Sequence, residues 1–195
     1  MVTERVTPRL APLEPPYSPE IGAQLSKMMP PGIPPIALFR TFVRNLPMAE
    51  AMGAWGSYEL SRRLSLSMRD REIVIDRTCA RCGCEYEWGV HVAFFAERVE
   101  LDHRQIASLT TGSSDDACWI DERDRLLIQA VDSLHDQADI SDELWEAMAG
   151  VFSDSNLLDL LLLCGWYHAI SFVARSTRLP LEPGSPTFAS VANRL

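Results

Sequence analysis

The sequence predicts an all-α protein, and two observations support this fold class. No stretch of useful length alternates apolar and polar residues as a half-buried strand would. Apolar residues recur instead at helical spacing, behind residues that commonly cap helices. With 195 residues, the chain is long enough to bury a core as one domain without disulfides.

An N-terminal arm is predicted over residues 1–35. Four prolines within residues 1–17 favour an extended segment rather than a packed one. Ser18, followed by Pro19, then starts a short helix that runs to about Met29. A stiff linker of further prolines joins this helix to the rest of the chain: Pro30, Pro31, Pro34 and Pro35.

A helical domain is predicted over residues 36–184. It begins with an amphipathic helix over residues 36–46 and continues with a helix that starts at Pro47 and runs to Leu64. Two central helices follow. Ser67 is a suitable N-cap for the first of them, in which a few apolar positions interrupt a charged surface.

Further signals divide the rest of the chain into helices. Gly83 ends the first central helix and places Cys84 in the first turn of the next. A capping box predicts a helix over residues 102–112. Helical periodicity returns over residues 119–136, and another capped helix spans residues 141–152.

The stretch from residue 157 to 174 is strongly apolar and resembles a membrane span. It contains Asp159 and His168, however, and it barely reaches the roughly 20 apolar residues that a spanning helix needs. We therefore expect no membrane partner and a helix buried on all sides, in the core or in a subunit interface. Prolines follow this helix, and residues 185–195 are predicted to form a C-terminal tail.

Composition excludes several classes of function. The formal net charge of -9 argues against nucleic acid or an anionic membrane as a partner, because both need a basic patch. The first residues lack the apolar centre of a signal peptide. Five cysteines, three of them between Cys79 and Cys84, do not form the pattern of a secreted disulfide framework. We expect a cytoplasmic protein that binds a small molecule.

Three side chains with useful chemistry share one face of the helix that follows Gly83. Cys84, Glu87 and His91 stand at positions i, i+3 and i+7. In the first turn, Cys84 would meet unpaired N–H groups and the positive end of the helix dipole, which favour a thiolate. Glu72, from the preceding helix, can fold back towards the same pocket. The competing interpretations are a buried, inert cysteine and an ordinary surface pair of Glu87 with His91.

This order of residues resembles the carboxymuconolactone decarboxylase and alkyl hydroperoxidase D superfamily. The likeness is strongest from Arg69 to His91, in the runs Arg-Glu-Ile-Val-Ile and Glu-Tyr-Glu-Trp-Gly-x-His, and weaker over residues 157–184. It implies a helical bundle of the alkyl hydroperoxidase D-like type, whose members generally self-associate into dimers, trimers or hexamers. It also implies a catalytic site made of Glu72, Cys84, Glu87 and His91.

One position departs from the peroxidase branch of this superfamily. A second cysteine stands there where this chain has Glu87, so the Cys-x-x-Cys redox pair is missing from its usual place. The Glu87-x-x-x-His91 arrangement is closer to the decarboxylase branch. Cys79 and Cys82 form a separate Cys-x-x-Cys upstream, and either could resolve a sulfenic acid on Cys84.

Three functional hypotheses follow. The leading one is acid–base decarboxylation or lactone chemistry on a small organic acid, with His91 as proton donor, Glu87 orienting it and Glu72 closing the relay. The alternative is a thiol-dependent alkyl hydroperoxidase with peroxiredoxin-type activity, in which Cys84 attacks the peroxide. The third is a non-catalytic, oligomeric binding protein that has kept the bundle and lost the chemistry.

A metal site is a further interpretation, but the sequence does not favour it. Cys79, Cys82, Cys84 and His91 are a possible ligand set. Their spacing crosses the helix break without the two paired knuckles of a typical zinc site. We therefore predict no metal and no cofactor.

The remaining candidates are interpreted as structural. Tyr86 and Trp88 flank the motif at a spacing typical of core packing. Tyr167 and His168 lie in the apolar stretch, where a buried histidine needs a hydrogen-bond partner in the core. His135, near the end of its predicted helix, suggests no role.

Overall fold

The protein is described here by a computed structural model over residues 7–192; residues 1–6 of the predicted arm and 193–195 of the predicted tail lie outside this range. The described residues form helices and no strand, which confirms the all-α fold class. The helices are α1 (Pro19–Met28), α2 (Ala37–Phe42), α3 (Leu46–Glu59), α4 (Met68–Arg81), α5 (Glu85–Phe95), α6 (His103–Thr111), α7 (Glu122–Gln137), α8 (Asp142–Ala149), α9 (Asp154–Thr177) and α10 (Phe188–Ala192), with short 3₁₀ turns η1 (Val43–Asn45) and η2 (Glu97–Val99).

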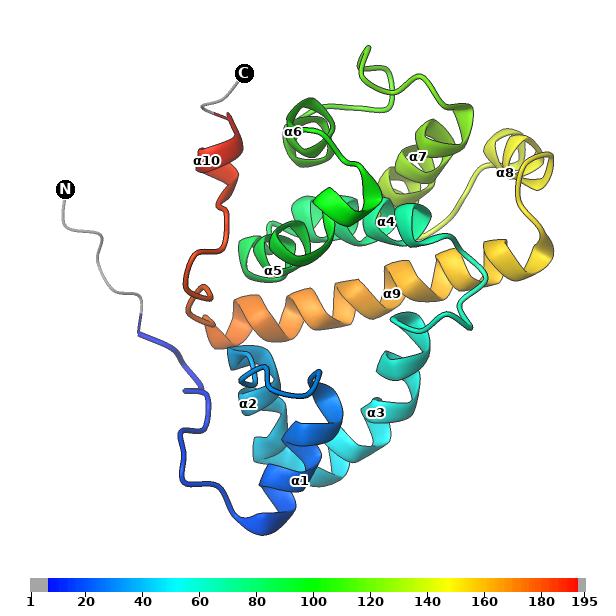
Figure 1. Ribbon diagram of the computed structural model, residues 1–195. Coiled ribbons are helices and arrows are strands. Elements are labelled where there is room, and N and C mark those ends of the chain that lie inside the picture. The colour runs from blue at the N-terminus through cyan, green and yellow to red at the C-terminus, as the bar shows by residue number, and fades with distance from the viewer. Residues whose placement is uncertain (1–6, 193–195) are drawn as a thin grey trace.

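The long helix α9 crosses the middle of the molecule. The N-terminal helices α1, α2 and α3 pack on one another on one side of α9, and α4 to α7 lie on the other (Figure 1). Helix α4 is central in this second group because it contacts α5, α6, α7 and α9. Because α9 lies between the two groups, it contacts α4 and α5 from the middle of the chain.

Capping residues set most of the helix starts, as the sequence predicts. Ser18 and Ser67 accept hydrogen bonds from backbone N–H groups at the first turns of α1 and α4. The capping box between Asp102 and Gln105 also forms. Helix α7 begins later than the periodicity indicates, because Asp121 caps it and Trp119 belongs to the preceding loop.

Several helix ends differ from the prediction. The segment 36–46 is split into α2 and η1, and α8 stops at Ala149 instead of Phe152. Helix α3 ends at Glu59 rather than Leu64. The Leu60 carbonyl accepts a hydrogen bond from the Arg71 guanidinium at 3.3 Å, a contact from another helix that local sequence cannot show.

The arm and the tail are both packed against the helices. The backbone N–H of Leu13 donates to the Arg40 carbonyl, and Arg44 donates to the Ala11 carbonyl, so the described arm is extended but held in place. The predicted tail contains α10, whose Phe188 ring lies 4.9 Å from the ring of Trp88. The division into segments 1–35, 36–184 and 185–195 stays a prediction.

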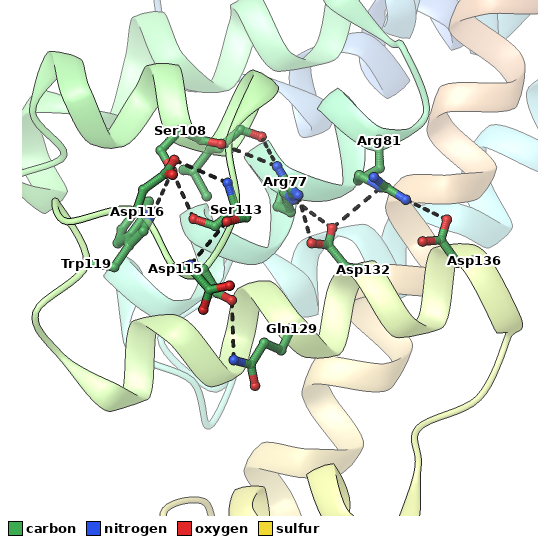
Figure 2. A network of polar contacts seen from close by, with 12 residues as sticks. Arg77, Arg81, Ser108, Ser113, Asp115, Asp116, Trp119, Gln129, Asp132 and Asp136 are labelled. Carbon is green, nitrogen blue, oxygen red and sulfur yellow. Dashed lines mark hydrogen bonds and ion pairs between the residues drawn. The ribbon is translucent and has the colours of Figure 1, made fainter.

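Helix α4 buries several charged side chains, although the sequence predicts that its charged residues form an exposed surface. Three of its arginines pair with aspartates of α7 at a constant separation of 55 residues: Arg69 with Asp124, Arg77 with Asp132, and Arg81 with Asp136. The equal separations mean that α4 and α7 run parallel. Figure 2 shows the last two pairs, beside the hydrogen bonds from Arg77 to backbone carbonyls of α6.

Within the single chain, helix α9 is buried along one face only, so the core of the chain does not cover it on all sides. Burial of the other face in a subunit interface stays a prediction. By length and composition α9 is the one helix in the described part of the chain that could cross a membrane, and half of its apolar window is buried inside the protein. Its contacts with α4, α5 and α8 are those of a core helix. The other face exposes Leu158, Leu162 and Phe172.

Candidate functional site

A buried polar relay joins α4, α5 and α9. The capped start of α4 places Glu72 in its second turn, and the break at Gly83, where φ is +63°, turns α5 back so that His91 faces Glu72. His91 Nδ1 donates to Glu72 Oε2 at 2.8 Å. Both side chains are shielded from solvent, since Glu72 is fully buried and His91 is nearly so. The predicted meeting of Glu72 and His91 is therefore present in the structure.

Helix α4 supplies the groups behind this pair. Arg71 binds Glu72 through its Nη2, which lies 2.6 Å from Oε1, so the carboxylate is held between an arginine and a histidine. Asp76, one turn further along, is completely buried, and burial followed by the charge of Glu72 raises its pKa well above the usual value. Burial therefore favours the uncharged form of the Asp76 carboxyl.

Glu87 and Tyr167 complete the relay on the other side of the imidazole. The hydroxyl of Tyr167, from α9, lies 3.0 Å from His91 Nε2. Glu87 Oε1 lies 3.6 Å from the same nitrogen, close enough for an ion pair but longer than a hydrogen bond. The second oxygen of Glu87 is buried and has no hydrogen-bond partner among the described residues. Glu87 therefore has an acceptor oxygen that no described group satisfies.

The two carboxylates keep His91 protonated. Burial by itself would lower the pKa of the imidazole, but the charge and hydrogen bond of Glu72 and those of Glu87 outweigh burial and raise the pKa to about 10. At neutral pH the ring is thus an imidazolium. When both nitrogens carry protons, Nδ1–H donates to Glu72 and Nε2–H donates to the Tyr167 oxygen.

A cavity of about 950 Å³ opens beside the relay. It lies where α1, α2 and α3 meet α5 and α9, and Glu87, His91 and Tyr167 of the relay form part of its wall. Other polar residues also line it: Gln24, Lys27, Glu50, Ser57 and Ser61. The other walls are mostly apolar and include Phe39, Phe42, Phe94, Phe95, Trp166 and Ile170. The size suits a small organic molecule. An apolar ligand would meet a proton donor and a carboxylate at one end.

Cys84 differs from its predicted environment. It is the N-cap residue of α5 and completely buried, and burial raises its pKa to about 11 in spite of a hydrogen bond from the Glu87 backbone. The expectation of a stabilised thiolate is therefore wrong, because burial outweighs the helix dipole. A second cavity, lined by Arg175 and Arg178, reaches Cys84 from another direction. Cys84 does not line the cavity beside His91.

The structure thus brings together Glu72, Glu87 and His91 and adds Tyr167, which the sequence indicates as a core residue. The only sequence signal for Tyr167 is its position in an apolar helix, where a buried hydroxyl needs a partner. That partner proved to be His91. The set Cys79, Cys82, Cys84 and His91 does not form a metal-binding group among the described residues.

Comparisons with known proteins identify the fold. No protein-family model matches this sequence, and no curated protein does. Among solved structures, the chain is similar to an uncharacterized peroxidase-related protein from Silicibacter sp. TM1040, with a TM-score of 0.78, 16% sequence identity, and coverage of 95% of this chain and 97% of that chain.

It is also similar to a protein of unknown function from Agrobacterium tumefaciens, described as a putative antioxidant defence protein AhpD. The TM-score is 0.63 and the identity 20%, over 72% of this chain and 97% of that chain. These likenesses define the class: the chain has the alkyl hydroperoxidase D-like helical fold that its resemblance to this superfamily implies.

Proposed function

We propose that the protein is an enzyme that transfers protons to or from a small, largely apolar organic molecule bound in the cavity beside His91. One observation carries this proposal. An imidazole whose pKa is raised to about 10, held by Glu72 on one side, meets Tyr167 and Glu87 in the wall of a largely apolar cavity. Such a site can stabilise negative charge that develops on a bound substrate and can then donate a proton to that substrate.

The chemistry that fits best is decarboxylation or lactone isomerisation of a small organic acid. When a vinylogous acid loses CO₂, the electron pair of the broken C–C bond remains on a dienolate. His91 Nε2–H stabilises that charge and gives its proton to carbon, while Glu72 keeps the ring oriented through Nδ1–H. Solvent then returns a proton to Nε2. Lys27 lies at the cavity wall and is suited to the substrate carboxylate.

A thiol-dependent hydroperoxidase is the second candidate, and the comparisons favour it. The titles of the two similar structures refer to peroxidase-related and antioxidant proteins, and neither refers to decarboxylation. In this chain Cys82 and Cys84 are two residues apart, both are free thiols, and both are buried. Cys84 would attack the terminal oxygen of an alkyl hydroperoxide, which breaks the O–O bond, releases the alcohol and leaves a sulfenic acid on Cys84. Cys82 would then condense with this sulfenic acid, with loss of water, to form a disulfide that an external dithiol reduces.

One set of variants separates these candidates. Wild-type protein is assayed with carboxymuconolactone, by loss of substrate absorbance, and with cumene hydroperoxide plus a dithiol reductant. Glu87→Gln, His91→Ala and Cys84→Ser are then compared with Cys118→Ser, a matched cysteine change away from both cavities. Circular dichroism establishes that each variant is folded.

The acid–base proposal expects the first activity to be lost in Glu87→Gln and His91→Ala and kept in Cys84→Ser. Peroxide turnover that disappears only in Cys84→Ser would overturn it in favour of the thiol peroxidase. If every variant binds and behaves like wild type apart from stability, the protein is a binding protein. Self-association and a cytoplasmic location stay predictions.

A further inference from the structure

A second cluster of reactive side chains lies at the C-terminal end of α4, whereas Glu72 of the relay lies near the start of that helix. Cys82 is the C-cap residue of α4, His135 is in the last turn of α7, and His168 is in the middle of α9. The two histidine nitrogens that face each other, His135 Nδ1 and His168 Nε2, are 3.0 Å apart. Cys82 Sγ lies 3.9 Å from the same nitrogen of His135.

We propose that Cys82, His135 and His168 form a binding site for a single Zn²⁺ ion. One ligand atom from each residue lies within 4.8 Å of the other two. A tetrahedral zinc ion with these ligands needs N···N and S···N separations of about 3.3 and about 3.5 Å, given Zn–N and Zn–S bonds of about 2.0 and about 2.3 Å. The observed 3.0 and 3.9 Å differ from these values by a few tenths of an ångström.

The surroundings orient the ligands as a metal site requires. His168 Nδ1 lies 2.8 Å from the Cys164 carbonyl, which can only accept, so this nitrogen carries the proton. Nε2 of a neutral His168 then presents its lone pair to the cluster. A hydrogen bond from the far nitrogen to a backbone carbonyl is the usual support of a metal-binding histidine.

The backbone of Cys82 is also fixed in place. Arg175 Nη1 donates to the Cys82 carbonyl at 2.6 Å, which ties the end of α4 to α9. The charge of the neighbouring Arg81 is offset by its pairs with Asp132 and Asp136. Thiolate and imidazole are ligands that zinc accepts readily.

The proposed ion would join α4, α7 and α9 and leave a fourth position for water. Both histidines are only partly buried, so that position can reach solvent. Three protein ligands with one open position differ from a closed structural site. None of the three ligands lines the cavity of the proposed proton-transfer site, so the inference does not rest on that function. A bound ion would instead block Cys82 as the resolving thiol of the second candidate function.

Titration of metal-free protein with Zn²⁺ and with Co²⁺ tests the proposal. We expect one ion per chain, a thiolate-to-cobalt charge-transfer band, and a melting temperature that rises by roughly 5–10 °C when free Zn²⁺ exceeds its Kd a hundredfold. Zn²⁺ should also protect Cys82 from alkylation, as read by peptide mass spectrometry.

Matched variants decide the ligand set. Cys82→Ser and His135→Ala should each remove the cobalt band and weaken Zn²⁺ binding at least tenfold, whereas Cys118→Ser and His103→Ala should bind like wild type. His135 is partly exposed at a helix end, so its variant should remain folded even if Cys82→Ser does not. Absence of binding by wild type, or unchanged binding by His135→Ala, would overturn the site.

Discussion

Glu72→Gln tests the central claim that a buried carboxylate keeps His91 protonated. The substitution keeps the size and a hydrogen-bond acceptor and removes the charge. For unit charges 2.8 Å apart, Coulomb's law with an effective dielectric constant of about 20 gives about 6 kcal/mol. Since 1.36 kcal/mol is worth one pKa unit, the pKa of His91 should fall from about 10 to about 6 in the variant.

Nitrogen-15 NMR of the imidazole, followed from pH 5 to about 11, measures this pKa directly. Glu97→Gln, an exposed change on η2, is the control and should leave the pKa at its wild-type value. A His91 pKa near 6.5 in the wild type, or one that Glu72→Gln does not lower, would refute the reasoning.

The same pKa predicts how stability depends on pH. The folded protein holds the His91 proton more tightly than the unfolded chain, whose ordinary value is 6.5. The resulting stabilisation is fully present below about pH 6.5 and is lost as the pH rises through about 10. Urea unfolding at several pH values should therefore show a decline over this alkaline range that is absent in Glu72→Gln.

Three further predictions concern the packing and the thiols. Arg77→Met should lower the free energy of unfolding in urea by about 3 kcal/mol, because it removes the ion pair of a buried arginine and leaves two carbonyls of α6 without their hydrogen-bond donor. A loss below about 1 kcal/mol would contradict this. Gly89→Ala should loosen the tail, since the new methyl would stand 2.8 Å from the Pro186 carbonyl oxygen; unchanged digestion by carboxypeptidase would speak against it. At neutral pH, Cys84 should react with a thiol reagent more slowly than the partly exposed Cys118, because burial raises the pKa of Cys84 to about 11; peptide mapping after brief labelling would show the reverse order if this is wrong.

The sequence predicts features of the fold that local chemistry controls. The helix starts at Ser18, Ser67 and Asp102 can be predicted because a cap and its N–H partner are only two or three residues apart. The break at Gly83 follows from a positive φ that glycine adopts at little cost. The end of α3 and the packing of α10 depend on contacts with distant residues, so no local pattern indicates them.

The same division holds for the candidate site. Helical spacing places Glu87 beside His91, and the turn between α4 and α5 brings Glu72 to them. Sequence reasoning gives the wrong direction for the pKa of Cys84, because the helix dipole is local whereas burial is produced by the whole fold. Tyr167 joins the relay from α9, and the sequence spacing between the two helices gives no sign of that contact.

The arginine–aspartate pairs between α4 and α7 fix the position of α7 along the axis of α4. If α7 slid by one helical turn, Arg77 would still meet an aspartate, Asp136. The other two arginines, which are half-buried, would face Ile128 and, beyond the end of α7, Ile140, and would lose their aspartate partners. Charged positions select the pairing of coiled coils in a similar way. A slip of four residues would also move His135 about 6 Å along the axis, so Cys82 and His135 can share an ion only in the alignment that the arginines select.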